Sequence, residues 1–318
     1  MRPFLRLASA GRLSDFDAKL IELLQLDGRT SYAQLARDLA VTERRVRSRV
    51  NALSREGTIR ISAVTDPRAL GYEAGALFAI SANGNQLIET LVEELMVNPR
   101  ISYVAVTAGR FTILAEAFCR DREELFMLAN NEILGLSGVG ALEIFPFLEI
   151  VYQEFTPNPT RVDRTRAVVS SRELDKTDSA IVRELSIDGR APAQAIANNL
   201  EISESQVRHR IKALTEDGLL RVAAIINPFG SHYQAMAWLG VCVQPGASAI
   251  ELAHAAGEIG AVTYVINTAG RYDALIEVAC TDHKELLQIL DEVRGLPGAG
   301  TIEAHLYLSV QYRPPLPL

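Results

Sequence analysis

Residues 27–59 read DGRTSYAQLARDLAVTERRVRSRVNALSREGTI, and residues 188–220 read DGRAPAQAIANNLEISESQVRHRIKALTEDGLL. The two stretches align without a gap at a shift of 161 residues, the difference between 27 and 188. Each stretch contains a short helical segment, a tight turn and a second amphipathic helix, followed by a glycine and an apolar strand. This order predicts a helix-turn-helix with a wing.

The ends of the predicted helices carry typical capping residues. Thr42 in the first copy and Ser203 in the second precede the third helix and suit its N-cap. Gly57 is placed to end that helix, and the pair Ala40-Val41 forms the tight turn before it. Gly28 follows the first helix, where we expect it to adopt a left-handed cap.

The duplication continues beyond these two stretches. At the same shift, Thr107-Ala108-Gly109-Arg110 matches Thr268-Ala269-Gly270-Arg271, and Cys119 matches Cys280. The shift slips to 160 only near GLSGVGALE and GLPGAGTIE. Because solenoid repeats have periods of roughly 20–50 residues, a period this long indicates duplicated domains. A chain of 318 residues has room for several domains.

The region after each helix-turn-helix alternates strand and helix patterns. In the first copy we expect strands at 76–81, 101–107, 111–119 and 142–154, and helices near 86–97 and 122–134. The resulting order β-α-β-β-α-β is ferredoxin-like. An antiparallel sheet of this kind has one face to cover, and we expect the sheets of the two copies to pack on each other.

The predicted fold class is therefore α+β, with two copies of a winged helix-turn-helix plus a ferredoxin-like βαββαβ sensor domain. We expect winged helix-turn-helix domains at 12–65 and 173–226, ligand-sensing domains at 72–154 and 233–313, and a linker at 155–172.

Composition narrows the functional classes. With 48% hydrophobic and 22% charged residues, the chain is typical of an ordered globular protein. The net charge of −7 argues against a protein that coats nucleic acid everywhere, although a local basic face suffices for DNA binding.

Cysteine and histidine usage predicts neither a metal nor a cofactor. The three cysteines and five histidines have no metal-ligand spacing, and Cys119 and Cys280 are interpreted as core residues. The N-terminal apolar run is too short for a signal peptide, and no membrane association is expected. These features fit a cytoplasmic protein.

The third helix of the first copy is strongly basic. It carries Arg44, Arg45, Arg47 and Arg49 within six residues, while its apolar positions face the other way. Arginine suits phosphate contacts and bidentate reading of guanine in the major groove. The predicted DNA-binding residues of the two copies are Thr42, Arg44, Arg45, Arg47, Ser48 and Arg49, and Ser203, Ser205, Gln206, Arg208, His209 and Arg210.

Two alternatives remain open for this helix. A basic face can simply be solvated, although the recurrence of cap, buried pattern, basic face and glycine at one offset argues for DNA binding. Arg49 and Arg210 could instead pin the helix to its own domain. Residues 12–60 hold ten Lys/Arg against seven Asp/Glu, whereas residues 173–221 hold seven against nine. We therefore expect the first copy to bind DNA more strongly.

Both copies resemble the leucine-responsive/asparagine-synthetase regulator (Lrp/AsnC) family across nearly the whole chain. The resemblance rests on the two helix-turn-helix stretches and on the turn Gly270-Arg271-Tyr272-Asp273; in the first copy Thr112 stands where the family has Asp. It implies paired sensor domains that bind an amino acid or related metabolite near this turn. The implied effector residues are Thr268, Ala269, Gly270, Arg271, Tyr272 and Asp273, with Thr107, Gly109, Arg110 and Phe111 as weaker candidates.

Two readings of the effector turn stay open. Asp273 could hold an ammonium group while backbone amides hold a carboxylate, or the segment could be an ordinary β-turn in which Asp273 bonds backbone. Thr112 puts a second, equivalent site in doubt.

The sequence thus favours a regulator without enzymatic activity. Its expected partners are double-stranded DNA, a small-molecule effector and further copies of itself, as dimers or tetramers of chains. The main rival is a tetrapyrrole-binding enzyme resembling sirohaem decarboxylase, for which Arg110, Arg271 and His305 are the obvious material. A third reading is a sensor that no longer binds DNA and acts by protein contact.

Overall fold

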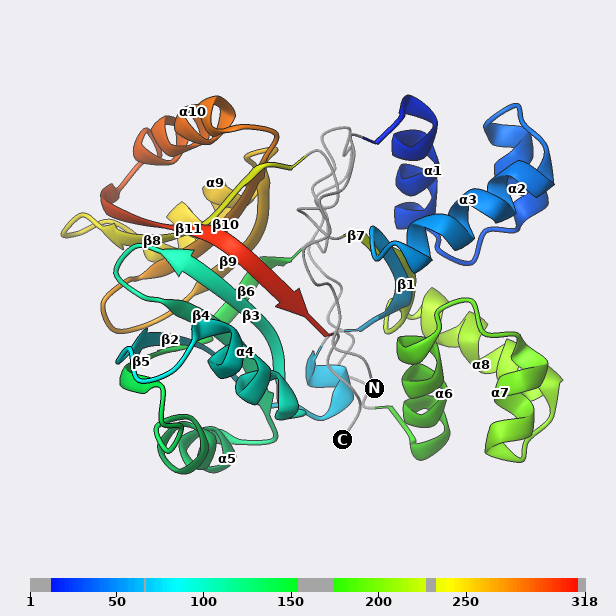
Figure 1. The fold of residues 1–318 in the computed structure, drawn as a ribbon, viewed down its shortest axis with the longest axis horizontal. Helices are drawn as coiled ribbons and strands as arrows, with labels where there is room; N and C mark the ends of the chain where they lie inside the picture. Colours follow the sequence, from blue (N-terminus) through cyan, green and yellow to red (C-terminus); the bar gives the residue numbers. More distant parts are fainter. Residues whose placement is uncertain (1–12, 66, 154–173, 227–232, 314–318) are drawn as a thin grey trace. The chain divides into compact units, whose positions relative to one another are not determined.

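The computed structural model describes residues 13–65, 67–153, 174–226 and 233–313, so the predicted linker at 155–172 lies outside the described residues. These residues form two compact units (Figure 1). The helix-turn-helix unit contains described residues of 13–72 and 174–226, and the sensor unit contains residues 73–153 and 233–313. Each unit therefore combines matching parts of both copies.

The helix-turn-helix unit contains two similar three-helix groups. The first consists of α1 (Asp15–Leu26), α2 (Tyr32–Asp38) and α3 (Glu43–Arg55), followed by β1 (Ile59–Val64) and the short 3-10 helix η1 (Pro67–Leu70). The second consists of α6 (Lys176–Ile187), α7 (Ala193–Leu200), α8 (Glu204–Glu216) and β7 (Arg221–Ile226).

The predicted N-caps at Thr42 and Ser203, the turn before α3 and the glycine that follows it are confirmed. The side chains of Thr42 and Ser203 accept hydrogen bonds from backbone amides of α3 and α8. The turns that precede these helices use left-handed residues, Ala40 with φ 53° and Glu201 with φ 56°. Gly57 also has a positive φ of 72°, as expected for a glycine that ends a helix.

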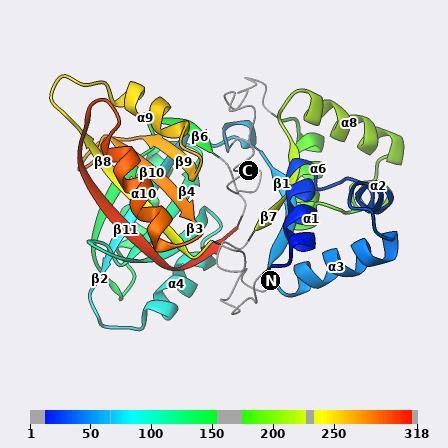
Figure 2. The ribbon, with the colours of Figure 1, turned by 90° about the horizontal axis from the view of Figure 1, so that it is seen from above.

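The strand that follows each third helix pairs with the other copy. β1 and β7 form a two-stranded antiparallel sheet in which Ile59 lies opposite Ile226 (Figures 1 and 2). The sequence correctly predicted a strand here, but its partner in the described chain comes from the other copy and not from a hairpin of its own. Backbone hydrogen bonds thus join the two helix-turn-helix groups directly.

Gly28 is required for a reason that the sequence did not reveal. It does not adopt a left-handed conformation, so the expected cap is wrong. Its backbone N–H donates to the Val222 carbonyl at 2.8 Å, and Gly189 donates to the Ile61 carbonyl at 2.9 Å. A Cβ atom on Gly189 would lie 2.8 Å from backbone atoms of Ile61. Glycine therefore permits each copy to approach the strand of the other.

The sensor unit is built around one antiparallel sheet with helices on its outside (Figures 1 and 2). Its nine strands follow the order β5-β2-β4-β3-β11-β8-β10-β9-β6. The first copy supplies β2 (Ala74–Ala82), α4 (Ile88–Val97), β3 (Ile101–Ala108), β4 (Ile113–Cys119), α5 (Arg122–Met127), the π-helix η2 (Leu128–Ile133), β5 (Val139–Pro146) and β6 (Glu149–Gln153). The second supplies β8 (Ala235–Val243), α9 (Ala249–Gly257), β9 (Val262–Asn267), β10 (Ala274–Cys280), α10 (His283–Arg294) and β11 (Ala299–Tyr312).

The last strand of each copy crosses to the other copy. The single strand expected at 142–154 is divided into β5, which pairs with β2 of its own copy, and β6, which pairs with β9 of the other. In the second copy, β11 does both, pairing with β8 and β3. Since only Phe147 and Leu148 separate the two ends of the sheet, it curls back on itself. The two ferredoxin-like halves are therefore joined along their edges by strand pairing. The sequence had predicted only that their sheets would pack face to face.

Each half has an apolar core between the sheet and its helices. Phe78 and Leu91 belong to the first core, and Leu239 and Leu252 to the second. Cys119 and Cys280 lie in these cores, as predicted, and burial raises the pKa of both thiols to about 12. Both thiols are therefore neutral and unreactive near neutral pH.

The slip of the repeat from 161 to 160 residues has a structural cause. The first copy needs 13 residues, 122–134, to reach Gly135, whereas the second needs 12, 283–294, to reach Gly295. The extra residue is absorbed in η2, where Leu134 donates to the Ala129 carbonyl five residues earlier. A π-turn accommodates one residue more than an α-turn, so the extra residue fits within the helix.

No helix within the described ranges is long and apolar enough to cross a membrane. The same residues contain no cluster of three or more metal-ligating side chains.

The close approach at Gly189 gives a test of the pairing. Gly189→Ala should lower the free energy of unfolding of the helix-turn-helix unit by roughly 2 kcal/mol, because backbone must move to admit the methyl group. Gly28→Ala should cost less, since its nearest obstacle is the Ile61 side chain. Urea unfolding of the full chain measures both. Gly257→Ala, which meets only Tyr152 at 3.6 Å, is the control, and equal stability of all three variants would contradict the account.

Candidate nucleic-acid interface and effector site

The exposed surface of α3 presents most of the predicted DNA-binding side chains of the first copy. Arg44, Arg45, Arg47 and Ser48 are all exposed. The Arg45 guanidinium lies 4.6 Å from the centre of the Phe16 ring. Arg47 forms an ion pair with Glu43 at 2.6 Å, but this pair is itself solvent-exposed and weak. The arginines of this surface can therefore turn towards a phosphate or a base edge at little cost.

Arg49 and Arg210 are held inside their own domains. The Arg49 Nε atom lies 2.6 Å from Oδ1 of Asp17, which is only 6% exposed. Arg210 pairs in the same way with the buried Asp178 at 2.7 Å and with Asp175. Burial acts to raise the pKa of Asp17, but hydrogen bonds from Arg49 and Ser14 outweigh it and hold the pKa below its usual value. This geometry favours the pinning role that the sequence left open.

The corresponding surface of α8 is chemically different. Ser205 and Gln206 occupy the positions of Arg44 and Arg45. The Gln206 side chain is used in the cap of α8, where it accepts from the Ser203 backbone at 2.9 Å. Arg208 pairs with Glu204 at 2.5 Å, and His209 is exposed. The second copy thus offers fewer cationic groups to DNA, in line with its negative charge balance.

A reciprocal pair of arginines joins the two helix-turn-helix groups. The Arg29 side chain donates to the carbonyls of Gly189 and Ala191 at 2.7 and 3.1 Å. Arg190 donates to the carbonyl of Gly28 at 2.6 Å and stacks over the Tyr32 ring at 4.3 Å. Burial and the charge of Arg190 lower the pKa of Arg29. Sequence reasoning missed this role, although the repeated Asp-Gly-Arg was visible.

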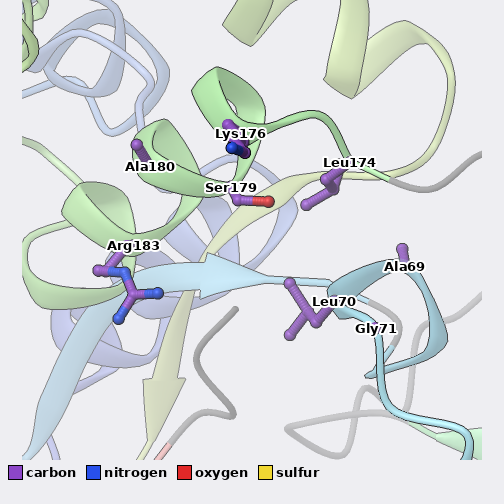
Figure 3. A pocket seen from close by; sticks show the side chains of 8 residues that line it. All are labelled: Ala69, Leu70, Gly71, Leu174, Lys176, Ser179, Ala180 and Arg183. Carbon is purple, nitrogen blue, oxygen red and sulfur yellow. The ribbon is translucent and has the colours of Figure 1, made fainter. Parts of the chain in front are cut away.

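Two hollows open on this unit. One, of about 390 Å³, lies beside the exposed face of α3 and is lined by Arg29, Ser31, Tyr32, Ala33, Glu43, Arg47 and Arg190. The other, of about 330 Å³, lies where α6 faces residues 69–71 (Figure 3). Its lining combines apolar side chains with Lys176 and Arg183. No sequence pattern indicated the second hollow, because its walls come from segments far apart in the chain.

The two predicted effector turns share aromatic neighbours inside the sensor unit. Phe111 of the first turn packs against His305 with ring centres 5.3 Å apart, and Tyr272 of the second packs against Phe145 at 5.2 Å. Phe111 and Phe145 are also in contact, as are Tyr272 and His305. Phe145 and His305 therefore connect the aromatic residues of the two turns.

Ion pairs between the copies flank these rings. Arg110 binds Glu303 at 3.0 Å, and Arg271 binds Glu143 at 2.7 Å. Glu303 also accepts a hydrogen bond from the Tyr272 hydroxyl at 2.6 Å. Glu303 therefore binds a residue of each turn. Phe111 occupies the position of Tyr272 in the first copy and has no hydroxyl, so it cannot make the matching hydrogen bond to Glu143. Among the remaining predicted residues, Thr107 and Thr268 are buried, and Gly109, Ala269 and Gly270 are exposed.

Asp273 makes a backbone contact that its counterpart reproduces. Its Oδ2 atom accepts from the Val243 amide at 2.8 Å. At the matching place, the Thr112 hydroxyl accepts from the Ala82 amide at 3.2 Å. The two residues therefore anchor their turns in the same way, and the structure favours a turn-stabilising role for Asp273. Thr112, which stands where the family has Asp, is therefore compatible with an intact turn.

The architecture is that of a helix-turn-helix regulator with attached ligand-binding domains. Family models match the same regions: an AsnC-type helix-turn-helix domain at residues 13–54 and 174–215, an Lrp/AsnC ligand binding domain at 236–315, and a C-terminal dimeric alpha+beta barrel domain at 80–156. The chain belongs to the Lrp/AsnC family.

Related proteins cover about one copy of this chain. A helix-turn-helix-type transcriptional regulator of Pyrococcus abyssi is 35% identical over 133 residues, which is 42% of this chain and 84% of the relative. The regulator LrpA of Pyrococcus horikoshii is 30% identical over 132 residues, 40% of this chain and 90% of the relative. Each matches most of its own length to less than half of this chain, as a tandem arrangement requires.

A solved structure shares the full architecture. The siroheme decarboxylase NirDL, crystallised with an iron-uroporphyrin III analogue, aligns with a TM-score of 0.62 over 95% of this chain and 94% of its own. Its sequence identity is 17%, so this likeness concerns the fold alone.

The internal ion pair of Arg49 predicts a stability effect. Arg49→Ala should lower the free energy of unfolding by about 1–2 kcal/mol, because Asp17 is left buried and unpaired while Arg49 itself is partly exposed. Arg47→Ala, which breaks an exposed pair, should change it by less than about 0.5 kcal/mol. Chemical denaturation of the full chain compares the two.

The Arg49→Ala effect also depends on pH. The pKa of Asp17 is depressed below its unfolded value of 3.8, so the contribution of the pair is present above that pH and lost as the pH falls through the folded pKa. The difference between wild type and Arg49→Ala should therefore shrink in acid. Unchanged stability combined with a loss of DNA affinity would instead assign Arg49 to phosphate binding.

The anchor of the second turn can be tested without knowing the effector. Asp273→Ala removes the acceptor of the Val243 amide and should lower the thermal midpoint by a few degrees. Asp273→Thr copies the residue of the first turn and should restore much of the loss. If both variants are as stable as wild type, the anchor does not support the turn.

Proposed function

We propose that this chain is a transcriptional regulator in which two covalently linked copies act as one regulator pair. The observation that carries the proposal is the pairing of the two helix-turn-helix groups through β1 and β7 and through Arg29 and Arg190. These contacts fix the separation of α3 and α8 within the unit. Such a pair addresses two half-sites on double-stranded DNA.

The two half-sites would not be read equally. α3 brings Arg44, Arg45 and Arg47 to its exposed surface, whereas α8 brings Ser205, Gln206 and Arg208. Arginine supplies both phosphate contacts and guanine recognition, so most of the affinity comes from the first copy. The preferred operator is therefore asymmetric within the footprint of one chain. Thr42 and Ser203 would act through the caps of these helices.

We infer that the effector is an amino acid or a related small metabolite bound near the turns at 107–111 and 268–273. Backbone amides of the exposed Ala269 and Gly270 could hold a carboxylate, with the nearby ion pairs setting specificity. Binding would favour one geometry of the paired sensor domains over another and so change the placement of the reading helices. We also propose that the chains associate into dimers or tetramers and that the protein acts in the cytoplasm.

A regulator role is better supported than tetrapyrrole chemistry. The residues that a tetrapyrrole site would draw on are engaged: Arg110 with Glu303, Arg271 with Glu143, and His305 buried at 2% exposure against Tyr272. The relatives carry names of transcriptional regulators. We therefore propose that the chain has no enzymatic activity.

Removal of two arginines tests the DNA assignment. Arg44→Ala combined with Arg45→Ala should weaken specific binding about tenfold or more and flatten the dependence of log affinity on log salt by about 2, one unit per lost phosphate contact. The matched variant, Ser205→Ala with Gln206→Ala, should change affinity much less. Fluorescence anisotropy with labelled duplex DNA in a salt series gives both quantities.

The same purified protein should be examined by absorption spectroscopy. Unchanged DNA affinity of the variant Arg44→Ala with Arg45→Ala would show that α3 does not contact DNA. A tetrapyrrole band in the visible spectrum, together with no preference for any DNA sequence, would replace the regulator by an enzyme.

A further inference from the structure

Two glutamates stand at matching positions inside the sensor unit. Glu116 on β4 and Glu277 on β10 are 161 residues apart and come from different copies. Glu116 is 5% exposed, and Glu277 is partly buried. A carboxylate removed from water is costly unless a cation or hydrogen bonds compensate it. These positions therefore need a physical explanation.

The groups around the two carboxylates are hydroxyls. Glu116 accepts from the Ser102 hydroxyl at 2.7 Å. Glu277 accepts from Thr263 at 2.6 Å and from Tyr307 at 2.5 Å, with the Tyr103 hydroxyl at 3.1 Å. Within the described ranges, the charged group that acts on Glu116 is Glu277, and no cation compensates either carboxylate.

The surroundings of the two glutamates differ at one position. Tyr307, which donates to Glu277, corresponds to Phe147 of the first copy at the shift of 160 residues. Three hydroxyls therefore donate to Glu277, whereas the Ser102 hydroxyl donates to Glu116. Glu277 is the better stabilised as an anion, and Glu116 is the better place for a proton.

We propose that Glu116 carries a proton inside the sensor unit while Glu277 is held as the anion, and that loss of this proton as the pH rises towards and through neutrality weakens the pairing of the two sensor domains. The network spans both copies, because the Tyr103 hydroxyl of the first copy donates to Glu277 of the second. When both carboxylates are ionised, their repulsion acts between the copies. The proposal rests on the sensor unit alone and is independent of DNA binding.

The electrostatics give the direction and range of the effect. Burial raises the pKa of Glu116 from 4.5 to about 7, and the charge of Glu277 adds to the increase. The folded protein therefore binds more protons than the unfolded chain between about pH 4.5 and 7, and its stability falls as the pH rises through this range. Burial also raises the pKa of Glu277.

Other groups facing the pair do not titrate in this range. Burial raises the pKa values of Tyr103, Tyr264 and Tyr307 well above 10, so these side chains stay neutral. Tyr312, which acts on Tyr264, is also a phenol. Ser102 and Thr263 carry no titratable charge. Glu116 is therefore the group in this cluster whose protonation changes near neutral pH.

Infrared spectroscopy of the full chain tests the proton directly. At about pH 6, where exposed carboxyls are ionised, the wild type should show the carbonyl band of a buried protonated carboxylic acid. Glu116→Gln should lose this band. Glu123→Gln, which changes an exposed glutamate on α5, should keep it. A wild-type spectrum without the band, or a band that Glu116→Gln retains, would overturn the assignment of the proton.

Thermal unfolding tests the consequence. The wild-type midpoint should fall by about 5 °C between about pH 5.5 and 8, beyond the change seen in Glu116→Gln, which mimics the protonated acid but cannot ionise. Tyr307→Phe removes one hydroxyl from Glu277 and should move the fall to higher pH, because the anion of the pair is less stabilised. Identical pH profiles for the wild type, Glu116→Gln and Tyr307→Phe would contradict the proposal.

Discussion

Backbone groups at the edge of a strand need partners, and in this chain many of those partners lie in the other copy. β1 is paired by β7 in the helix-turn-helix unit, while β9 is paired by β6 and β3 by β11 in the sensor unit. Separating the copies would expose these edges. The duplicated sequence therefore specifies mutual pairing, and the placement of the reading helices and effector turns depends on it.

Covalent linkage of the copies allows matching positions to diverge while the pairing is kept. The glycines and arginines at 28, 29, 189 and 190 are identical in the two copies and make reciprocal contacts. Elsewhere the pairs differ, as Arg44 differs from Ser205 and Phe147 from Tyr307. A dimer of identical chains cannot hold such differences. The scaffold is thus nearly symmetric, and its recognition chemistry is not.

Local features of the fold could be predicted from the sequence because short-range patterns encode them. The caps at Thr42 and Ser203, the βαββαβ order and the buried Cys119 and Cys280 are examples. Contacts between copies could not be predicted in this way. The crossing of β6, the close approach at Gly28 and the reciprocal arginines depend on segments about 160 residues apart, whose proximity no local periodicity reveals.

In the candidate sites, too, local residue spacing was predictable, whereas contacts between separate segments were not. The basic face of α3 was evident from residue spacing, but the engagement of Arg49 by Asp17 required the arrangement of α1 against α3. The inner glutamates were overlooked because Glu116 and Glu277 occupy strands that otherwise appear simply apolar. Likewise, Asp273 and Thr112 differ in sequence, yet each accepts a backbone hydrogen bond at the same place.

Recognition of an asymmetric operator by the linked pair is best measured by a footprint of the full chain on the DNA upstream of its own coding region, with scrambled DNA as the reference. Two unlike half-sites about one helical turn apart should be protected in a sequence-specific and salt-sensitive way, with stronger protection at one of them. Equal protection of specific and scrambled DNA would contradict this prediction.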